Sequence, residues 1–68
     1  MKIRDYTVPE LEYLKQNCNF TEDELMYFEL KSKDISNIKI SLKMHISISQ
    51  VSKIAKRVSL KISRILNK

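Results

Sequence analysis

Residues 37–54 read NIKISLKMHISISQVSKI, and they carry the most specific fold signal in the chain. Two helices that cross through a tight turn need apolar residues that lock both to a core, and a small residue where they touch. Counted from Asn37, Ser41 takes the position where only a small side chain fits. The core positions are filled by apolar side chains, namely Ile40, Met44, Ile46, Val51 and Ile54. The stretch therefore predicts a helix-turn-helix unit, with a first helix over 37–44 and a second that begins after Ser47.

The turn departs from the usual pattern, because His45 stands where glycine commonly supplies a left-handed backbone. Histidine is among the non-glycine residues enriched in that region, so the strain is modest. We interpret His45 as a turn residue rather than as a ligand or a pH sensor.

The same residues also fit a second pattern. From Ile38 to Ile48, apolar and polar residues alternate strictly, and by periodicity alone such a segment is a strand. A strand needs a partner, and the chain holds no second alternating segment. Pairing with the same strand of a second copy, as in ribbon-type DNA-binding proteins, stays open as the alternative.

Helix start signals divide the rest of the chain. In a capping box, a Ser or Thr side chain accepts an early amide, and a Glu or Gln three residues later reaches back. The boxes are Thr7–Glu10, Thr21–Glu24 and Ser47–Gln50, and Ser36 can cap a helix alone. With no glycine and one proline, residues 1–68 are predicted to be a single all-α, four-helix domain. The expected helices span residues 8–18, 22–33, 37–44 and 48–66.

At 68 residues the chain is so small that its core requires additional stabilisation. A domain of this length buries only about 60% of the surface that its unfolded chain exposes. The usual help is a disulfide framework, a metal or a second chain. Cys18 is the only cysteine, which excludes an internal disulfide, and one histidine with one cysteine makes no conventional zinc site. We therefore expect a homodimer, with no metal and no cofactor.

The sequence also bears on location. No apolar run approaches the ~20 residues of a membrane span, and no signal peptide opens the chain, so the expected location is the cytoplasm. An amphipathic membrane-surface helix over residues 48–66 is an alternative use of the same charges, on anionic lipid. Such a helix wants large apolar or aromatic residues, which makes this alternative less favoured.

Charge is divided sharply between the two halves of the chain. Residues 1–34 hold all eight acidic residues against five basic ones, a net charge of −3. Residues 35–68 hold eight basic residues and no acid, a net charge of +8. Such asymmetry suggests one face that meets a polyanion and another that faces away from it. The plain alternative is that lysine-rich helices are simply soluble.

Four short motifs follow one another along the second two thirds of the chain: FTEDE at 20–24, ISN at 35–37, ISISQV at 46–51 and KI at 61–62. They resemble the Leu-Thr-x-x-Glu, Leu-Ser-Asn, Ile-Ser-x-Ser-Thr-Val and Lys-Leu motifs of the LuxR/GerE-type helix-turn-helix domain, a relative of region 4 of sigma factors. The resemblance covers about residues 20–62 and implies a DNA-binding regulator of transcription. Small standalone chains of this kind resemble regulators of phages and mobile elements.

The chain also departs from that family. The helix expected at 8–18 is not part of the family's core, and the separate fourth helix that often makes the family's dimer contact has no room here. The mode of dimerisation is therefore not implied by the resemblance.

The helix expected over residues 48–66 gives the positive charge of the second half of the chain a structural role. Its apolar residues form one stripe at helical spacing, namely Val51, Ile54, Ala55, Val58, Ile62 and Ile65. The resemblance places base-reading positions on Ser52, Lys53 and Lys56. Ser49 and Gln50 join them, because the first side chains of a helix in the major groove reach base edges first. A capping-box role for Gln50 competes with base reading. Phosphate contacts are assigned to Lys39, Lys43, Arg57, Lys61 and Arg64.

Some apolar residues fit neither the core nor the groove comfortably: Ile38, Leu42, Ile48 and Leu60. An exposed apolar set on so small a domain usually marks a contact with protein. Leu60 and Leu66 favour a helix-pairing dimer near the C-terminus. Ile38 and Leu42 are assigned to a second partner such as RNA polymerase.

Catalysis has almost no support, since no Ser/His/Asp set, glycine loop for phosphates or acid pair in an apolar stretch can be assembled. We predict a sequence-specific regulator of transcription that binds duplex DNA and is not an enzyme. The alternative is a protein-interaction adaptor, such as an anti-sigma or polymerase-binding module, whose basic helix is incidental.

Overall fold

A computed structural model describes residue 3 and residues 6–66 of the chain. Its elements are four helices, and the described residues contain no strand: α1 is Val8–Asn17, α2 is Glu22–Ser32, α3 is Asn37–Met44 and α4 is Ile48–Leu66. The predicted all-α, four-helix domain is confirmed. The alternation over 38–48 is not a strand, because these residues form α3, the following turn and the start of α4.

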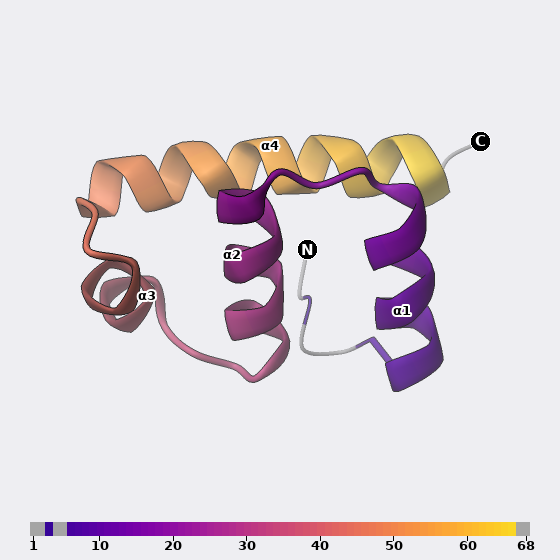
Figure 1. The fold of residues 1–68 in the computed structure, drawn as a ribbon, viewed down its shortest axis with the longest axis horizontal. Coiled ribbons are helices and arrows are strands. Elements are labelled where there is room, and N and C mark those ends of the chain that lie inside the picture. The colour runs from indigo at the N-terminus through magenta and orange to yellow at the C-terminus, as the bar shows by residue number, and fades with distance from the viewer. Residues whose placement is uncertain (1–2, 4–5, 67–68) are drawn as a thin grey trace.

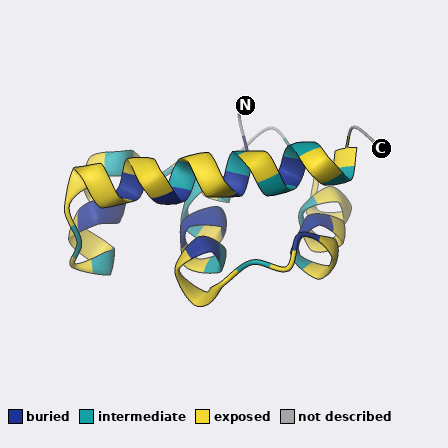
Figure 2. Ribbon diagram, turned by 90° about the horizontal axis from the view of Figure 1, so that it is seen from above, coloured by how far each residue is buried: buried dark blue, intermediate teal, exposed yellow. Residues whose placement is uncertain are grey.

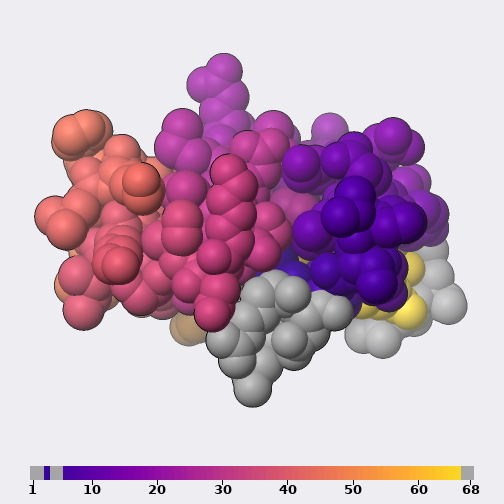
Figure 3. Space-filling model, turned by 90° about the horizontal axis from the view of Figure 1, so that it is seen from below, coloured from indigo at the N-terminus to yellow at the C-terminus, as the bar shows by residue number. Residues whose placement is uncertain are grey.

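Helix α4 is the element on which the other three are assembled. It extends along the length of the molecule, and α3, α2 and α1 pack against it in that order from its first turn to its last (Figure 1). Seen from below, the three short helices form a surface that largely hides α4 (Figure 3). Seen from above, α4 lies in front and presents mostly exposed residues (Figure 2). One side of α4 is therefore core and the other is open to solvent.

The predicted apolar stripe accounts for this division. Val51, Ile54, Val58 and Ile62 are the buried residues of α4, and their spacing of three and four places them on one side of the helix. Ala55 and Ile65 are partly buried against the same core. Each short helix adds its own buried side chain, with Leu14 from α1, Phe28 from α2 and Ile40 from α3. Full burial of such a side chain contributes about 1.5–3 kcal/mol.

The helices begin where the caps predict. Thr7 and Glu10 form a complete capping box at α1, in which the Thr7 amide donates to Glu10 Oε1 at 2.8 Å. Thr21 and Glu24 form the second box at α2. Ser36 caps α3 by accepting the amide of Lys39 at 3.4 Å. Helices α1 and α2 end one residue earlier than expected, because Cys18 and Lys33 are their C-caps.

Each of the three connections turns on one residue with a positive φ. Asn19 has φ 56° between α1 and α2, Asp34 has φ 61° between α2 and α3, and His45 has φ 57° between α3 and α4. Asparagine, aspartate and histidine are the side chains best tolerated in this left-handed region. A chain without glycine thus makes its sharp turns with these three types. The left-handed conformation expected for His45 is confirmed.

We expect His45→Gly to raise the free energy of unfolding by about 1 kcal/mol, because a Cβ in the left-handed region carries roughly that cost. Urea denaturation followed by circular dichroism measures the change. His45→Val should lower the free energy of unfolding, since a β-branched side chain tolerates this region poorly. Equal stability of the two variants would show that His45 is not held in this conformation.

Candidate nucleic-acid interface

The exposed side of α4 carries the five residues predicted to read bases. Ser49, Gln50, Ser52, Lys53 and Lys56 are all exposed. At 3.6 residues per turn, Ser49, Lys53 and Lys56 lie opposite the buried stripe, with Ser52 and Gln50 on its two flanks. The structure therefore places these five residues on the solvent-facing sides of one helix.

The third predicted capping box is only half formed. Ser47 Oγ accepts the backbone amide of Gln50 at 3.2 Å, which caps α4. The returning bond, from the Ser47 amide to the Gln50 side chain, is absent between these two described residues. The competing capping role that we expected for Gln50 is wrong. Its carboxamide is exposed and available to a ligand.

The first turn of α4 differs electrostatically from those of α1 and α2. Helix α1 has Glu10 there, and α2 has Glu22, Asp23 and Glu24, whereas α4 has no acid. The N-terminus of a helix carries a partial positive charge from the aligned peptide dipoles. At α4 that partial charge is not offset by a neighbouring carboxylate of the same turn, so the end of the helix favours an anion.

Glu24 is the one buried acid among the described residues, with 2% of its surface exposed. Its Oε1 accepts the Thr21 amide at 3.0 Å and also pairs with Lys61 Nζ, while its Oε2 accepts from Arg57 Nε at 3.1 Å. The two cations come from α4, 33 and 37 residues further along the chain. One carboxylate thus completes the cap of α2 and fastens α2 to the middle of α4.

The ionised form of Glu24 is stabilised despite its burial. Desolvation by burial alone would raise its pKa. The hydrogen bonds from Lys61 and Thr21, together with the charges of Lys61 and Arg57, outweigh that effect and hold the pKa of Glu24 below its usual value. The carboxylate is therefore charged at neutral pH and neutralises part of the positive charge of α4.

This ion cluster divides the five residues predicted to contact phosphate. The ammonium of Lys61 is already occupied, because it pairs with Glu24 and also donates to the carbonyl of Asn19 at 3.2 Å. Arg57 uses only Nε toward Glu24 and keeps 54% of its side chain exposed, so its outer nitrogens stay accessible. The other three have no acidic partner within the described part of the chain, and all three are exposed: Lys39, Lys43 and Arg64.

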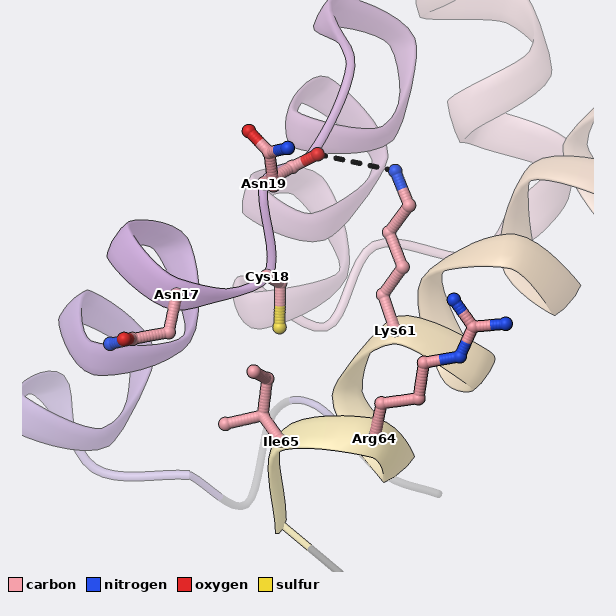
Figure 4. A pocket seen from close by; sticks show the side chains of 6 residues that line it. All are labelled: Asn17, Cys18, Asn19, Lys61, Arg64 and Ile65. Atoms are coloured by element: carbon pink, nitrogen blue, oxygen red, sulfur yellow. Dashed lines mark hydrogen bonds between the residues drawn. The ribbon is translucent and has the colours of Figure 1, made fainter. Parts of the chain in front are cut away.

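The remaining side chains around Lys61 form a hollow of about 360 Å³ (Figure 4). The Cys18 thiol points into it toward Ile65, and Arg64 lies at its edge. Asn17 does not offer its amide there, since Nδ2 donates to the carbonyl of Tyr13 at 2.7 Å. Burial raises the pKa of the Cys18 thiol, although the charge of Lys61 opposes the rise. Cys18 is therefore a packing residue rather than a thiolate nucleophile.

The predicted dimer contact is not a single surface. Leu60 and Leu66 are both exposed, but six residues along a helix turn them roughly 120° apart, so one straight partner helix cannot cover both. Leu60 alone lies between the cations of the exposed face. Antiparallel pairing of two copies of α4 about Leu60 would bring Lys56 of one against Arg64 of the other. The dimer through these leucines stays a prediction, and like charges oppose it.

The role of Glu24 was missed by the sequence reasoning, which treated it only as a cap. A signal was present in the spacing. Tyr27 and Phe28 follow Glu24 by three and four residues, and both are buried. Side chains three and four apart share one face of a helix, which places Glu24 on the buried face of α2. A charge on that face requires a partner of opposite sign.

The described residues contain neither a metal-binding cluster nor a membrane-spanning helix. No group of three or more His, Cys, Asp or Glu side chains there could hold a metal ion. None of the helices in this part of the chain has the length and apolarity that a membrane crossing requires. Comparisons with protein-family models, curated proteins and solved structures find no match for the chain. The resemblance to the LuxR/GerE-type domain therefore rests on the short motifs alone.

We expect Glu24→Gln to lower the free energy of unfolding by about 1–3 kcal/mol at pH 7, because charge-assisted hydrogen bonds to Lys61 and Arg57 are lost. Glutamine can still serve a capping box, so the loss reports the charge. The wild-type protein itself should lose stability as the pH falls below about 4.5, since a depressed pKa stabilises the fold only while the carboxylate is ionised. Urea denaturation at several pH values measures both effects.

The difference in the free energy of unfolding between the wild type and Glu24→Gln should therefore become smaller from pH 7 to pH 3. Glu22→Gln is the matched control, since Glu22 lies in the same turn but is exposed, and its effect should stay within a few tenths of a kcal/mol. If this difference in the free energy of unfolding is the same at both pH values, Glu24 does not stabilise the fold through its charge.

Proposed function

We propose that the protein is a helix-turn-helix regulator of transcription that binds duplex DNA, with the first half of α4 in the major groove. The observation that carries the proposal is the surface from Ser49 to Lys56, which is exposed, contains hydrogen-bonding and basic side chains, and has no acid. The major groove of B-DNA is wide enough to admit an α-helix. At 1.5 Å per residue, this half of α4 spans roughly 12 Å, about the width of the groove.

The proposed roles follow from position. Ser49, Gln50 and Ser52 have polar groups that can meet base edges, and the free carboxamide of Gln50 suits the N6 and N7 atoms of adenine. Lys53 and Lys56 lie one turn apart at the centre of the exposed face, where they can donate to guanine O6 and N7.

Phosphate contacts are proposed for the cations beside this surface. Lys39 and Lys43 lie on α3, which packs against the start of α4, and both are exposed without an acidic partner in the described residues. Arg57 can contribute through its outer nitrogens, and Arg64 only where the duplex follows α4 to its last turn. We assign Lys61 to Glu24 instead of to phosphate, because its ammonium is already paired.

A protein partner is the second candidate, either as an addition to DNA binding or in its place. Ile38 and Leu42 lie one turn apart on the outer side of α3 and are 62% and 70% exposed. Such a pair can pack against an apolar strip of another protein, for which RNA polymerase or a second regulator is the natural choice. A homodimer through Leu60 is less favoured because Lys56 and Arg64 flank that residue.

We expect Lys53→Ala to weaken binding to a selected duplex by about 1–3 kcal/mol and to affect random duplex much less, since a base contact discriminates by that amount. Selected duplexes come from repeated rounds of binding to a random pool. Fluorescence anisotropy over a range of salt concentrations gives both affinities and the salt slope, which changes by about 0.9 for each phosphate contact.

Lys15→Ala is the control, because Lys15 belongs to α1, far from the first turn of α4, and pairs with Glu29 at 3.3 Å. Its affinities should equal those of the wild type. Equal losses of Lys53→Ala on both duplexes would make Lys53 a phosphate contact. Binding to no duplex at low salt would reject DNA binding and leave the protein partner as the function.

A further inference from the structure

Ile48 has no role in the core and none among the polar contacts described above. It is the first residue of α4 and is 51% exposed. Its neighbours Ile46 and Val51 supply the packing, since Ile46 is partly buried against the core and Val51 is fully buried. Ile48 is instead surrounded in sequence by Ser47, Ser49 and Gln50, all exposed. An apolar side chain thus stands at the tip of the helix.

The position of Ile48 at the start of α4 distinguishes it from an isolated exposed isoleucine elsewhere on the surface. If α4 enters the major groove, its first residues approach the base edges most closely. The major groove presents one apolar group, the 5-methyl of thymine, and apolar side chains read it by contact. Ile48 is the only apolar side chain among residues 47–50.

Ser52 strengthens this assignment. It lies four residues after Ile48, so the two side chains stand one above the other on the same side of α4. Ser52 is exposed and has a hydroxyl that can donate to a base acceptor. In thymine, O4 is an acceptor that lies next to the 5-methyl in the major groove. Ile48 and Ser52 together therefore match both features of one thymine edge.

We propose that Ile48 determines specificity by contacting the 5-methyl of a thymine, with Ser52 donating to O4 of the same base. This inference rests on the proposed function, and it narrows the ligand class to duplexes with an A·T pair opposite the tip of α4. It also gives Ile48 a partner on DNA, in place of the protein contact that its exposure suggested.

The test replaces thymine by uracil, which lacks the 5-methyl but keeps O4 and its base pairing. In a selected duplex, each thymine is exchanged singly for deoxyuridine, and the affinity is measured by anisotropy. Burial of one methyl group contributes about 0.8 kcal/mol, so the wild-type protein should bind about fourfold more weakly when one particular thymine is exchanged. Ile48→Ala should bind the thymine and uracil duplexes equally well.

Leu42→Ala is the matched control, because Leu42 is an exposed apolar residue on α3 rather than at the tip of α4. It should keep the full fourfold sensitivity to uracil. Wild-type protein that is insensitive at every thymine, a selected site without thymine, or an Ile48→Ala variant that keeps the sensitivity would each overturn the assignment. These outcomes leave DNA binding intact, whereas failure to bind any duplex rejects the proposed function and Ile48 reading together.

Discussion

A single buried carboxylate, that of Glu24, joins the N-terminus of α2 to the middle of α4. A buried charge is costly unless it is paired and hydrogen-bonded, and this one is satisfied by an amide of its own helix and by two cations of α4. The same oxygen atoms thus fix where α2 begins and where α2 lies along α4. Helix α4 in turn contacts each of the other three helices, and its buried side carries the apolar stripe.

This pairing also divides the basic residues of the second half of the chain into those that contact Glu24 and those that do not. Lys61 is turned toward α2 and the connection that follows α1, and Arg57 is partly engaged. The cations of α3 and of the first half of α4 keep no acidic partner in the described residues. The buried side of α4 contributes to the core along its whole length, whereas on its exposed side the basic residues of the early half keep no acidic partner in the described residues. The proposed DNA surface coincides with the early half.

Local features were predictable from the sequence because they depend on neighbouring residues. The caps at Thr7, Thr21 and Ser36, the left-handed His45 and the burial of Ser41 follow from short spacings, and all are present. The limits of α3 and α4 followed from the same signals. The strand alternative for 38–48 arose because isoleucines at every second position satisfy both periods, and packing against α4 decided in favour of helix.

Contacts between distant residues were not predictable in the same way. Which cations pair with Glu24 depends on where α4 crosses α2, a property of the assembled core rather than of any local spacing. For this reason the phosphate roles predicted for Arg57 and Lys61 take no account of their pairing with Glu24. The half-formed box at Gln50 is of the same kind, because a capping motif permits the returning bond but does not enforce it.

The proposal that the exposed face in the early half of α4 meets DNA can be tested in solution. The most direct measurement is the change in backbone amide chemical shifts, by NMR, as a selected duplex is added. We expect the largest changes over residues 47–56, with smaller changes at Lys39 and Lys43 and almost none in α1. Changes concentrated around Leu60 and α1, with residues 47–56 unaffected, would contradict the proposal.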